Sequence, residues 1–487
     1  MTLRPAPDVR PGIADGDIGA PVVGRISETP IVTSRFPRLS AVDLTNLAVE
    51  APDSPMHVAI LAVLDGTALC DALGRLRLNV LRTRIDGLLD AVPELRRIVY
   101  RPGPLAGPPL WVDDPAFRID RQVDQIELPA PADEPALLRL AENLLLPMLD
   151  RDHPMWRIWF VTGLPDGRIA ALVALHHAIA DGPAAVALLT ALTGPAAVND
   201  APPRTHAAAP RWSELARDSA TARLAALRQL TRVRRPHPVA SLRGNWRVLT
   251  RAWHAPRTSL TGPIGPYRDL AVVRFDLDAV RQVAHAHGGK VNDVVLGLAA
   301  GGLRTLLRSR GESVERLRIH AAVAMSPKGL GPSPRTGNRS GIIVVALPLG
   351  EPDPTERLRL ICHDAARAQR DQPHTTEQGM LIWLARLSLL RRYTRRQHLT
   401  NIVESDVIGP PTPIRLFGAP VIDLIPIGAL AGNLAISFLA FSYAGRLTIT
   451  VRVDAHRCPD LPVLIAAMAQ EWQSLLAAAP TAVAVAR

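Results

Sequence analysis

The chain has 487 residues and 47% of them are hydrophobic, so it can build two packed domains and is not globally disordered. Aromatic residues make up only 4%, which argues against binding single-stranded nucleic acid by base stacking. The formal net charge is +11, so the location of the positive charge decides whether it indicates an anionic partner.

The first folded domain is predicted over residues 36–200. Residues 1–35 are rich in Pro and Gly and lack an apolar segment, which predicts a disordered leader and no signal peptide. The predicted elements of the domain are a strand at 58–63, a helix at 73–85, strands at 156–162 and 169–175, and a helix at 184–192. The two later strands flank a Pro-Asp-Gly turn and predict a hairpin.

Residues 201–266 form an arginine-rich linker segment. Between Arg211 and Arg257 there are eleven arginines and two acidic residues, a net charge of +9 that accounts for most of the +11. Helical spacing of apolar residues over 212–233 predicts a basic amphipathic helix. Two interpretations stay open, a solvated linker helix and a helix that lies on an anionic lipid surface. A second basic amphipathic stretch at 381–396 favours the surface role.

The second folded domain is predicted over residues 267–480, followed by a short tail at 481–487. Its predicted strands lie at 271–275, 319–325, 342–348, 401–407 and within 419–453, and its predicted helices at 277–287, 292–308, 354–370, 379–396 and 459–478. Helices alternating with strands in two blocks indicate an α+β fold with α/β layers.

Residues 424–443 carry no charge and are long enough for a transmembrane helix. Pro426, Gly428, Gly432 and Asn433 interrupt this stretch. Two buried strands joined by a Gly-Asn turn therefore explain it better than a spanning helix.

The strongest motif is HHAIADG at residues 176–182, where a predicted strand ends and a predicted helix begins. A side chain at such a junction can be held rigidly and still face a cleft. One interpretation is structural, with two histidines satisfied by backbone carbonyls and Asp181 as a helix N-cap. The other is catalytic, because a histidine with an ordinary pKa of about 6.5 can act as a general base at neutral pH.

Other catalytic chemistries have less support in the sequence. A Ser-His-Asp hydrolase would need a GxSxG turn, which is absent. There is no HExxH motif, and the other histidines supply no convincing ligand set, so no metal is expected. Cys70, Cys362 and Cys458 lie far apart and outside any CxxC pair, which fits a reducing compartment without a disulfide framework.

HHAIADG resembles the HHxxxDG signature shared by CoA-dependent acyltransferases and the condensation domains of peptide synthetases. Further segments narrow this resemblance: SPMHV at 54–58, DRDHPMW at 150–156, KVNDVVL at 290–296, GN at 337–338, SDVIGP at 405–410 and SYAGRL at 442–447. In this order and spacing, residues 39–475 resemble the bacterial wax ester synthase/acyl-CoA:diacylglycerol acyltransferase family.

The resemblance implies two chloramphenicol-acetyltransferase-like halves with a tunnel between them, where acyl-CoA and a lipid alcohol meet at the motif. The site residues that it implies are His177 as the general base, His176 as a supporting residue, Asp181 and Gly182 as loop residues, and Asn292 and Asp293 as substrate-binding residues. Transfer would be direct, without an acyl-enzyme. The residues alone also allow a simpler role for Asn292 as the N-cap of a long helix, with Asp293 favouring the positive end of that helix.

We therefore expect an O-acyltransferase that moves a long acyl chain from acyl-CoA to diacylglycerol and forms triacylglycerol. Acyl-CoA would be a co-substrate, and no cofactor is expected. Wax ester synthesis on fatty alcohols is an alternative that differs only in the acceptor. A cytoplasmic location is expected, with peripheral contact to the inner membrane or lipid droplets and no nucleic-acid partner.

Several positions depart from the pattern of the family. Arg157 stands where an acidic residue is usual, and Asp406 and Ile408 replace Asn and Pro. The segment MSPK at 325–328 also replaces the more usual Pro-Val-Ser-Val-Arg. These departures leave open an alternative of another class, a catalytically weak lipid-binding or lipid-droplet surface protein. A condensation-type amide former is a further enzyme alternative, but it would be expected beside carrier-protein domains.

Overall fold

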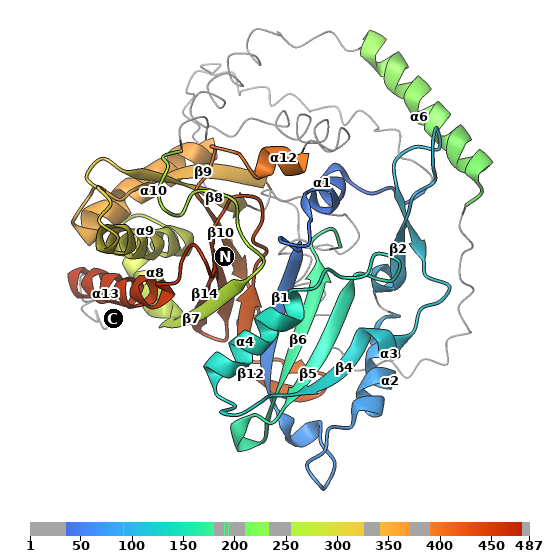
Figure 1. The fold of residues 1–487 in the computed structure, drawn as a ribbon, viewed down its shortest axis with the longest axis horizontal. Coiled ribbons are helices and arrows are strands. Elements are labelled where there is room, and N and C mark those ends of the chain that lie inside the picture. Colours follow the sequence, from blue (N-terminus) through green and yellow to red (C-terminus); the bar gives the residue numbers. More distant parts are fainter. Residues whose placement is uncertain are drawn as a thin grey trace, which may run out of the picture.

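The computed structural model describes residues 36–90, 92–179, 189, 193, 210–232, 255–325, 341–370 and 390–479. These residues form two halves, each built on a six-stranded sheet, together with a two-stranded ribbon (Figure 1). The expected mixture of helices and sheets is therefore confirmed. The predicted leader and tail lie outside the described residues, as does the helix expected at 184–192, apart from Leu189. Residues 379–389 of the helix expected at 379–396, which holds the second basic stretch, also lie outside them.

The first half contains α1 (Ala41–Val49), β1 (His57–Asp65), α2 (Leu78–Leu88), β2 (Arg97–Tyr100), β3 (Leu110–Asp113), α3 (Ile119–Gln122), β4 (Val123–Glu127), α4 (Glu134–Leu145), β5 (Trp156–Thr162) and β6 (Arg168–His176). β5 and β6 form the predicted antiparallel hairpin. The apolar sequence of β6 reflects burial on both faces. Ala171 and Val173 pack in one core with α2, whereas Ala170 and Leu172 pack in another with α4.

The sheet of the first half also contains two strands from the C-terminal part of the chain, β11 (Arg415–Leu416) and β12 (Ala419–Ile427). The strand order is β11-β12-β1-β6-β5-β4, and β12 runs antiparallel to β1. Ile425 and Ile427 are fully buried in the core beneath α4. The first half therefore completes its core with a strand that follows most of the second half in sequence.

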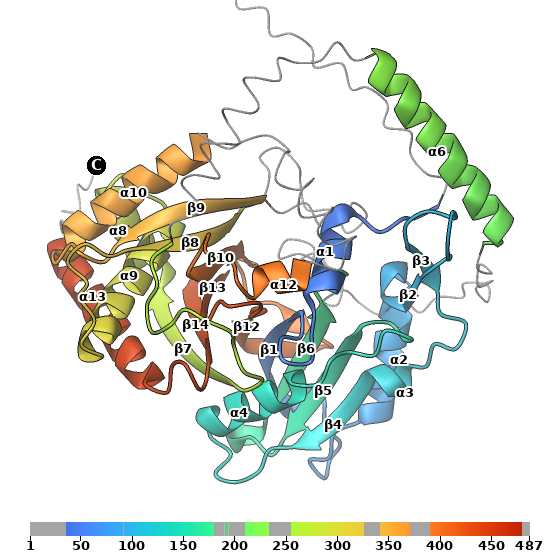
Figure 2. The ribbon, with the colours of Figure 1, turned by 45° about the horizontal axis from the view of Figure 1, so that its top comes forward.

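The second half contains β7 (Arg268–Asp276), α8 (Leu277–Ala286), α9 (Val291–Ser309), β8 (Arg318–Met325), β9 (Gly341–Pro348), α10 (Pro354–Arg370), α12 (Leu390–Thr394), β10 (Ile402–Ile408), β13 (Ile436–Tyr443), β14 (Arg446–Asp454) and α13 (Leu461–Ala478). Its sheet has the order β7-β14-β13-β10-β8-β9, and α8, α9, α10 and α13 lie together on one side of it (Figures 1 and 2). On β7, Leu270 and Val272 pack instead against the core of the first half.

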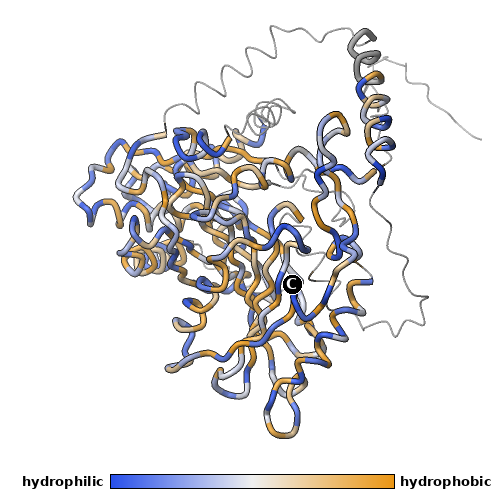
Figure 3. The backbone as a smooth tube through the Cα atoms, turned by 45° about the vertical axis from the view of Figure 1, so that its right-hand side comes forward, coloured by the Kyte–Doolittle hydropathy of each residue, from blue (hydrophilic) through white to orange (hydrophobic). Residues whose placement is uncertain are grey.

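The uncharged stretch at 424–443 contains the end of β12 and all of β13, so the prediction of two buried strands is confirmed. The two strands belong to different sheets and do not pair with each other. Among the described residues, no helix is long and apolar enough to cross a membrane. Hydrophobic and hydrophilic segments are interspersed along the described chain (Figure 3).

The predicted basic helix is present as α6 (Trp212–Arg232), which lies at the edge of the molecule beside the β2–β3 ribbon (Figures 1 and 2). Leu215 is fully buried in a small core that includes Leu110, which anchors the start of the helix. Arg38 reinforces this contact with a 3.2 Å ion pair to Asp218. The first turns of α6 are thus packed against the protein, whereas Leu224, further along the helix, is exposed.

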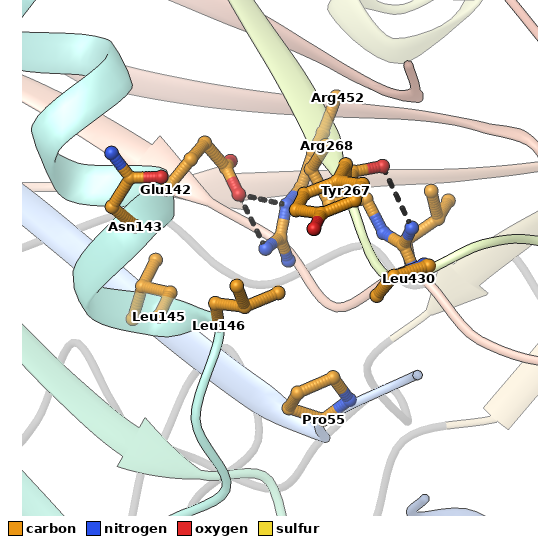
Figure 4. Close-up of a pocket in the computed structure, with 10 residues that line it drawn as sticks. Pro55, Glu142, Asn143, Leu145, Leu146, Tyr267, Arg268, Leu430 and Arg452 are labelled. Atoms are coloured by element: carbon orange, nitrogen blue, oxygen red, sulfur yellow. Dashed lines mark hydrogen bonds and ion pairs between the residues drawn. The ribbon is translucent and has the colours of Figure 1, made fainter. Parts of the chain in front are cut away.

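A pocket in the seam between the halves is shown in Figure 4. Arg452 of β14 donates to Glu142 of α4 at 2.7 Å. Arg268 of β7 donates to the carbonyl of Asp53 at 2.7 Å. Burial, followed by the charge of Arg452, lowers the pKa of Arg268 to about 10, so Arg268 stays charged at neutral pH. The halves are thus joined by buried cations of the second half that bind acceptors of the first.

Candidate active site

The two histidines of HHAIADG stand at the end of β6, between the start of β1 and the start of β5. The His177 N–H donates to the carbonyl of Met56 at 2.8 Å, and the His176 N–H donates to the carbonyl of Met155 at 2.9 Å. The segments around Met56 and Met155 are two of those that carried the family resemblance. Their backbone therefore holds the histidine pair from both sides.

His176 is completely buried and its ring has a defined orientation. Nδ1 accepts a 2.9 Å hydrogen bond from the N–H of Ala178, so in the neutral ring Nε2 carries the proton. Nε2 lies 3.4 Å from a carboxylate oxygen of Glu50. His176 thus connects the backbone just after His177 to a buried carboxylate.

His177 is half-buried, and its backbone and ring lie beside Asn46 of α1. The amide nitrogen of Asn46 donates to the His177 carbonyl at 3.1 Å and lies 3.5 Å from Nδ1 of the same residue. Asp181 and Gly182 lie outside the described residues, so their loop role stays a prediction.

Glu50, at the end of α1, is the buried carboxylate behind the motif. Arg151 donates to its Oε2 through Nη2 at 2.5 Å and Nε at 3.2 Å. Burial alone would raise the pKa of Glu50, but His176, Arg151 and the Met56 N–H outweigh it and lower the pKa to about 2. Glu50 is therefore an anion at any working pH.

His57, the first residue of β1, is also buried near Glu50, with Nε2 3.9 Å from Oε1. Its Nε2 accepts from the N–H of Leu149 at 3.2 Å. Burial lowers the pKa of His57 to about 4, so this ring is neutral. Within the part of the chain that the structure describes, no group of three or more His, Cys, Asp or Glu residues could hold a metal ion.

The predicted substrate-binding residues of the second half contact that half's own interior. With its amide nitrogen toward Glu404, Asn292 donates to the two carboxyl oxygens at 2.6 and 3.0 Å. Asp293 accepts from the N–H of Lys290 at 2.8 Å and completes the first turn of α9. Lys290 is the N-cap of this helix, so the simpler expectation that Asn292 caps it is wrong. A substrate contact of Asn292 and Asp293 stays a prediction.

Glu404 and Asp406 lie two residues apart on β10 and so share one face of the sheet. Burial, with an added contribution from the Asp406 charge, raises the pKa of Glu404 well above its ordinary value. Burial raises the pKa of Asp406 to about 6. Burial similarly raises the pKa of Asp293. The second half therefore contains three carboxyl groups whose pKa values are all raised by burial.

Two other departures from the family pattern lie on strands. Arg157, on β5, has Nη2 3.7 Å from Asp124 and its guanidinium 5.1 Å from the ring centre of Trp159. Ile408, the last residue of β10, is 80% exposed. The arginine therefore has local partners of its own, whereas nothing in the structure explains the isoleucine.

Sequence reasoning missed Asn46 and Glu50, and it quoted His57 and Arg151 only as parts of motifs. One signal could have found Glu50. It stands at the end of an apolar helical segment, four residues before the SPMHV motif, where an acidic residue needs a cationic partner if it is buried. Asn46 gives no comparable signal, because an isolated amide on a short helix is common.

Known protein families match most of the chain. The model of the wax ester synthase/diacylglycerol acyltransferase catalytic domain matches residues 39–295, and that of the WS/DGAT C-terminal domain matches residues 336–475. "Probable diacylglycerol O-acyltransferase tgs1" of Mycobacterium tuberculosis H37Rv is 29% identical and covers 74% of this chain and 79% of its own length. A second protein of that strain, also named as a diacylglycerol O-acyltransferase, is 28% identical over 91% of this chain and 97% of its own length.

Solved structures show the same fold. A wax ester synthase/diacylglycerol acyltransferase from Marinobacter aquaeolei VT8 superimposes with a TM-score of 0.64 at 22% identity, covering 92% of this chain and all of that one. The starter condensation domain of rhizomide synthetase, in a complex with C8-CoA and Leu-SNAC, gives a TM-score of 0.57 at 14% identity over 94% and 98% of the two chains. The expectation of two halves of the chloramphenicol-acetyltransferase type is thereby confirmed. The chain belongs to the wax ester synthase/diacylglycerol acyltransferase family of acyltransferase enzymes.

Proposed function

We propose that the protein transfers a long acyl chain from acyl-CoA to the free hydroxyl of diacylglycerol and forms triacylglycerol. The observation that carries the proposal is His177, which is half-buried at the end of β6. Its N–H is bound to the Met56 carbonyl, and the N–H of the preceding His176 is bound to the Met155 carbonyl. Two family models match the chain, and relatives are named diacylglycerol O-acyltransferases.

In the proposed mechanism His177 is a general base. It accepts the proton of the acceptor hydroxyl as the oxygen attacks the thioester carbonyl and forms the new C–O bond. The C–S bond then breaks, and the CoA sulfur takes the proton back from the imidazolium. A positioned base of this kind contributes about 10²–10⁴ in rate. The reaction balances with acyl-CoA and an alcohol alone, so we propose that it needs no cofactor or metal.

The state of the cysteines supports direct transfer without an acyl-enzyme. Burial raises the pKa of Cys362 to about 11 and that of Cys458 to about 12. Burial also raises the pKa of Cys70. A cysteine nucleophile needs a thiolate, and these environments disfavour it at neutral pH.

An acceptor assay tests the reaction and separates the alternatives. Purified protein is incubated with radiolabelled palmitoyl-CoA and either diolein or hexadecanol, and the lipid products are separated. Labelled triacylglycerol is the expected product. Wax ester formed in preference to triacylglycerol would identify the protein as a wax ester synthase. No product with either acceptor would contradict the enzyme and favour a lipid-binding role.

We also propose that α6 contacts an anionic lipid surface. Trp212 and Leu224 are more than half exposed, and Arg217 and Arg223 are exposed on the same helix. Apolar side chains combined with arginines are typical of helices that lie at a membrane interface.

Flotation on liposomes tests this surface. The parent protein should float with vesicles that contain phosphatidylserine and less with vesicles of phosphatidylcholine alone. Neutralising Arg217 and Arg223 to Gln should reduce flotation on the anionic vesicles. Equal flotation of the double variant and the parent would remove the proposal for α6.

A further inference from the structure

The buried anion Glu50 lies directly behind the proposed base. Its side chain has no solvent exposure, and it receives hydrogen bonds from Arg151 and from the N–H of Met56. Moving a carboxylate from water into the protein interior costs free energy. A buried carboxylate is therefore expected to have a tightly bound partner or a specific task. The question is what this anion does for the motif beyond balancing Arg151.

The first task is to set the tautomer of His176. The N–H of Ala178 donates to Nδ1, which leaves the proton on Nε2. Nε2 makes no hydrogen bond to any described residue, and it faces Oε2 of Glu50 at 3.4 Å. A negative acceptor at this place favours a proton on Nε2 and keeps Nδ1 free to accept.

The second task is to fix the backbone on both sides of the His177 side chain. Met56 donates its N–H to Glu50 Oε1 at 3.2 Å and accepts the His177 N–H at 2.8 Å with its carbonyl. On the other side, Ala178 is bonded to the ring that faces Glu50. One carboxylate thus reaches both peptide groups that flank His177, each through a single intermediary.

Arg151 extends the same network to α1. Besides its two bonds to Glu50, Nη2 donates to the carbonyl of Leu47 at 3.1 Å. Leu47 follows Asn46, whose amide contacts His177. The guanidinium therefore ties the anion to the helix that approaches the other edge of the proposed base.

We propose that Glu50, held by Arg151, is the positioning residue of the site, which keeps His176 in its Nε2–H tautomer and thereby orients His177. This proposal rests on the proposed function, in which His177 is the general base. Glu50 itself need not touch substrate. The groups that face its carboxylate at hydrogen-bond range are donors, so an amide in its place would set a donor against a donor.

A second buried pair in the chain supplies a matched control. Arg357 donates to Glu471 at 2.6 and 2.7 Å, and both side chains are almost fully buried. This pair links α10 to α13 in the second half. It shares the chemistry of the Glu50–Arg151 pair but has no hydrogen bond to the described residues of the histidine motif, 176–179.

The experiment compares Glu50→Gln with Glu471→Gln in the full-length protein. For each variant kcat and KM are measured with palmitoyl-CoA and diolein, and Tm is recorded. We expect Glu50→Gln to lower kcat by about tenfold to a hundredfold with KM changed by less than about threefold, because misplacing a catalytic group affects the chemical step. Glu471→Gln should lower Tm comparably and keep kcat within about twofold. Similar kcat values for the two variants would overturn the proposal.

A double-mutant cycle tests whether Glu50 acts through His176. In a His176→Ala background, Glu50→Gln should lower kcat by less than about threefold, because the interaction is already lost. An undiminished effect in that background would contradict a role through the ring. If Glu50→Gln does not fold, Arg151→Lys replaces it: a lowered kcat at unchanged KM supports the proposal, and an unchanged kcat contradicts it.

His177→Ala separates failure of this inference from failure of the proposed function. Loss of activity in His177→Ala together with normal kcat in Glu50→Gln would leave the base in place and overturn only the positioning role. Full activity in His177→Ala would overturn the proposed base, and with it the role assigned to Glu50.

Discussion

Asp406→Asn should stabilise the protein, and the gain should grow with pH. Asp406 lies on β10 and is half-buried, and burial raises its pKa from 3.8 to about 6. Glu404, two residues earlier on the same face, is fully buried and its pKa is raised as well. The substitution places the residue usual for the family at this position and removes one ionisable group from the cluster.

The sign follows from proton linkage. A carboxyl whose pKa is higher in the folded state binds more protons there, so folding is favoured below pH 3.8 and this advantage is lost as the pH rises through about 6. The rise from 3.8 to about 6 corresponds to about 3 kcal/mol, at about 1.4 kcal/mol for each pH unit. Asn does not ionise and so has no such penalty. The free energy of unfolding of Asp406→Asn should therefore exceed that of the parent by about 3 kcal/mol above pH 7 and by about 1.5 kcal/mol at pH 5.

Equilibrium urea unfolding of the parent and of Asp406→Asn at pH 5 and pH 8 measures both values. Asp278→Asn, which changes an exposed carboxyl of α8, is the control and should differ from the parent by less than about 0.5 kcal/mol at both pH values. A difference between Asp406→Asn and the parent that is absent at pH 8, or equal at the two pH values, would refute the reasoning.

Three further substitutions test packing or a buried hydrogen bond in three separate parts of the molecule. Gly302→Ala would place Cβ 2.7 Å from side-chain atoms of Leu464 and Met468 on α13, so the free energy of unfolding in urea should fall by about 1–3 kcal/mol, and no fall would contradict this contact. Trp156→Phe removes the 2.6 Å bond from Nε1 to the buried carbonyl of Leu95 and should cost about 1–3 kcal/mol by the same measurement, whereas a neutral effect would mean that the carbonyl finds another donor. Leu215→Ala should release α6, seen as faster limited proteolysis within 210–232 at nearly unchanged Tm; unchanged cleavage would show that other contacts hold the helix.

The local structure was largely predictable because the responsible forces are local. Strict runs of apolar residues between turn formers place β5 and β6 within a residue of their predicted limits. The helix α10 begins and ends at the predicted residues, since Pro354 opens it and apolar residues recur at helical spacing.

The arrangement of the strands was not predictable in the same way. β12 is as apolar as β13, and nothing in their composition indicates that one joins the first sheet and the other the second. β12 joins the first sheet because it pairs with β1, a strand more than 350 residues earlier in sequence. Pairing over such a separation leaves no local signal.

The candidate site also combines residues that a local motif predicts with residues that only the tertiary structure brings together. HHAIADG marks His176 and His177 because two adjacent histidines at a strand end are chemically conspicuous. Glu50 and Asn46 come from a separate helix and reach the motif only when α1 packs beside β6. Asn292 and Asp293 were recognised as a motif, yet their contacts are with Glu404 and the first turn of α9.

The central claim is that His177 acts as a general base in a direct transfer. Its most direct test is the rate of triacylglycerol formation from palmitoyl-CoA and diolein by His177→Ala, with His285→Ala, at an exposed position on α8, as the control. The account predicts a fall of about 10²-fold or more for His177→Ala and a change of less than about twofold for His285→Ala. A His177→Ala enzyme that turns over at the parental rate would contradict it.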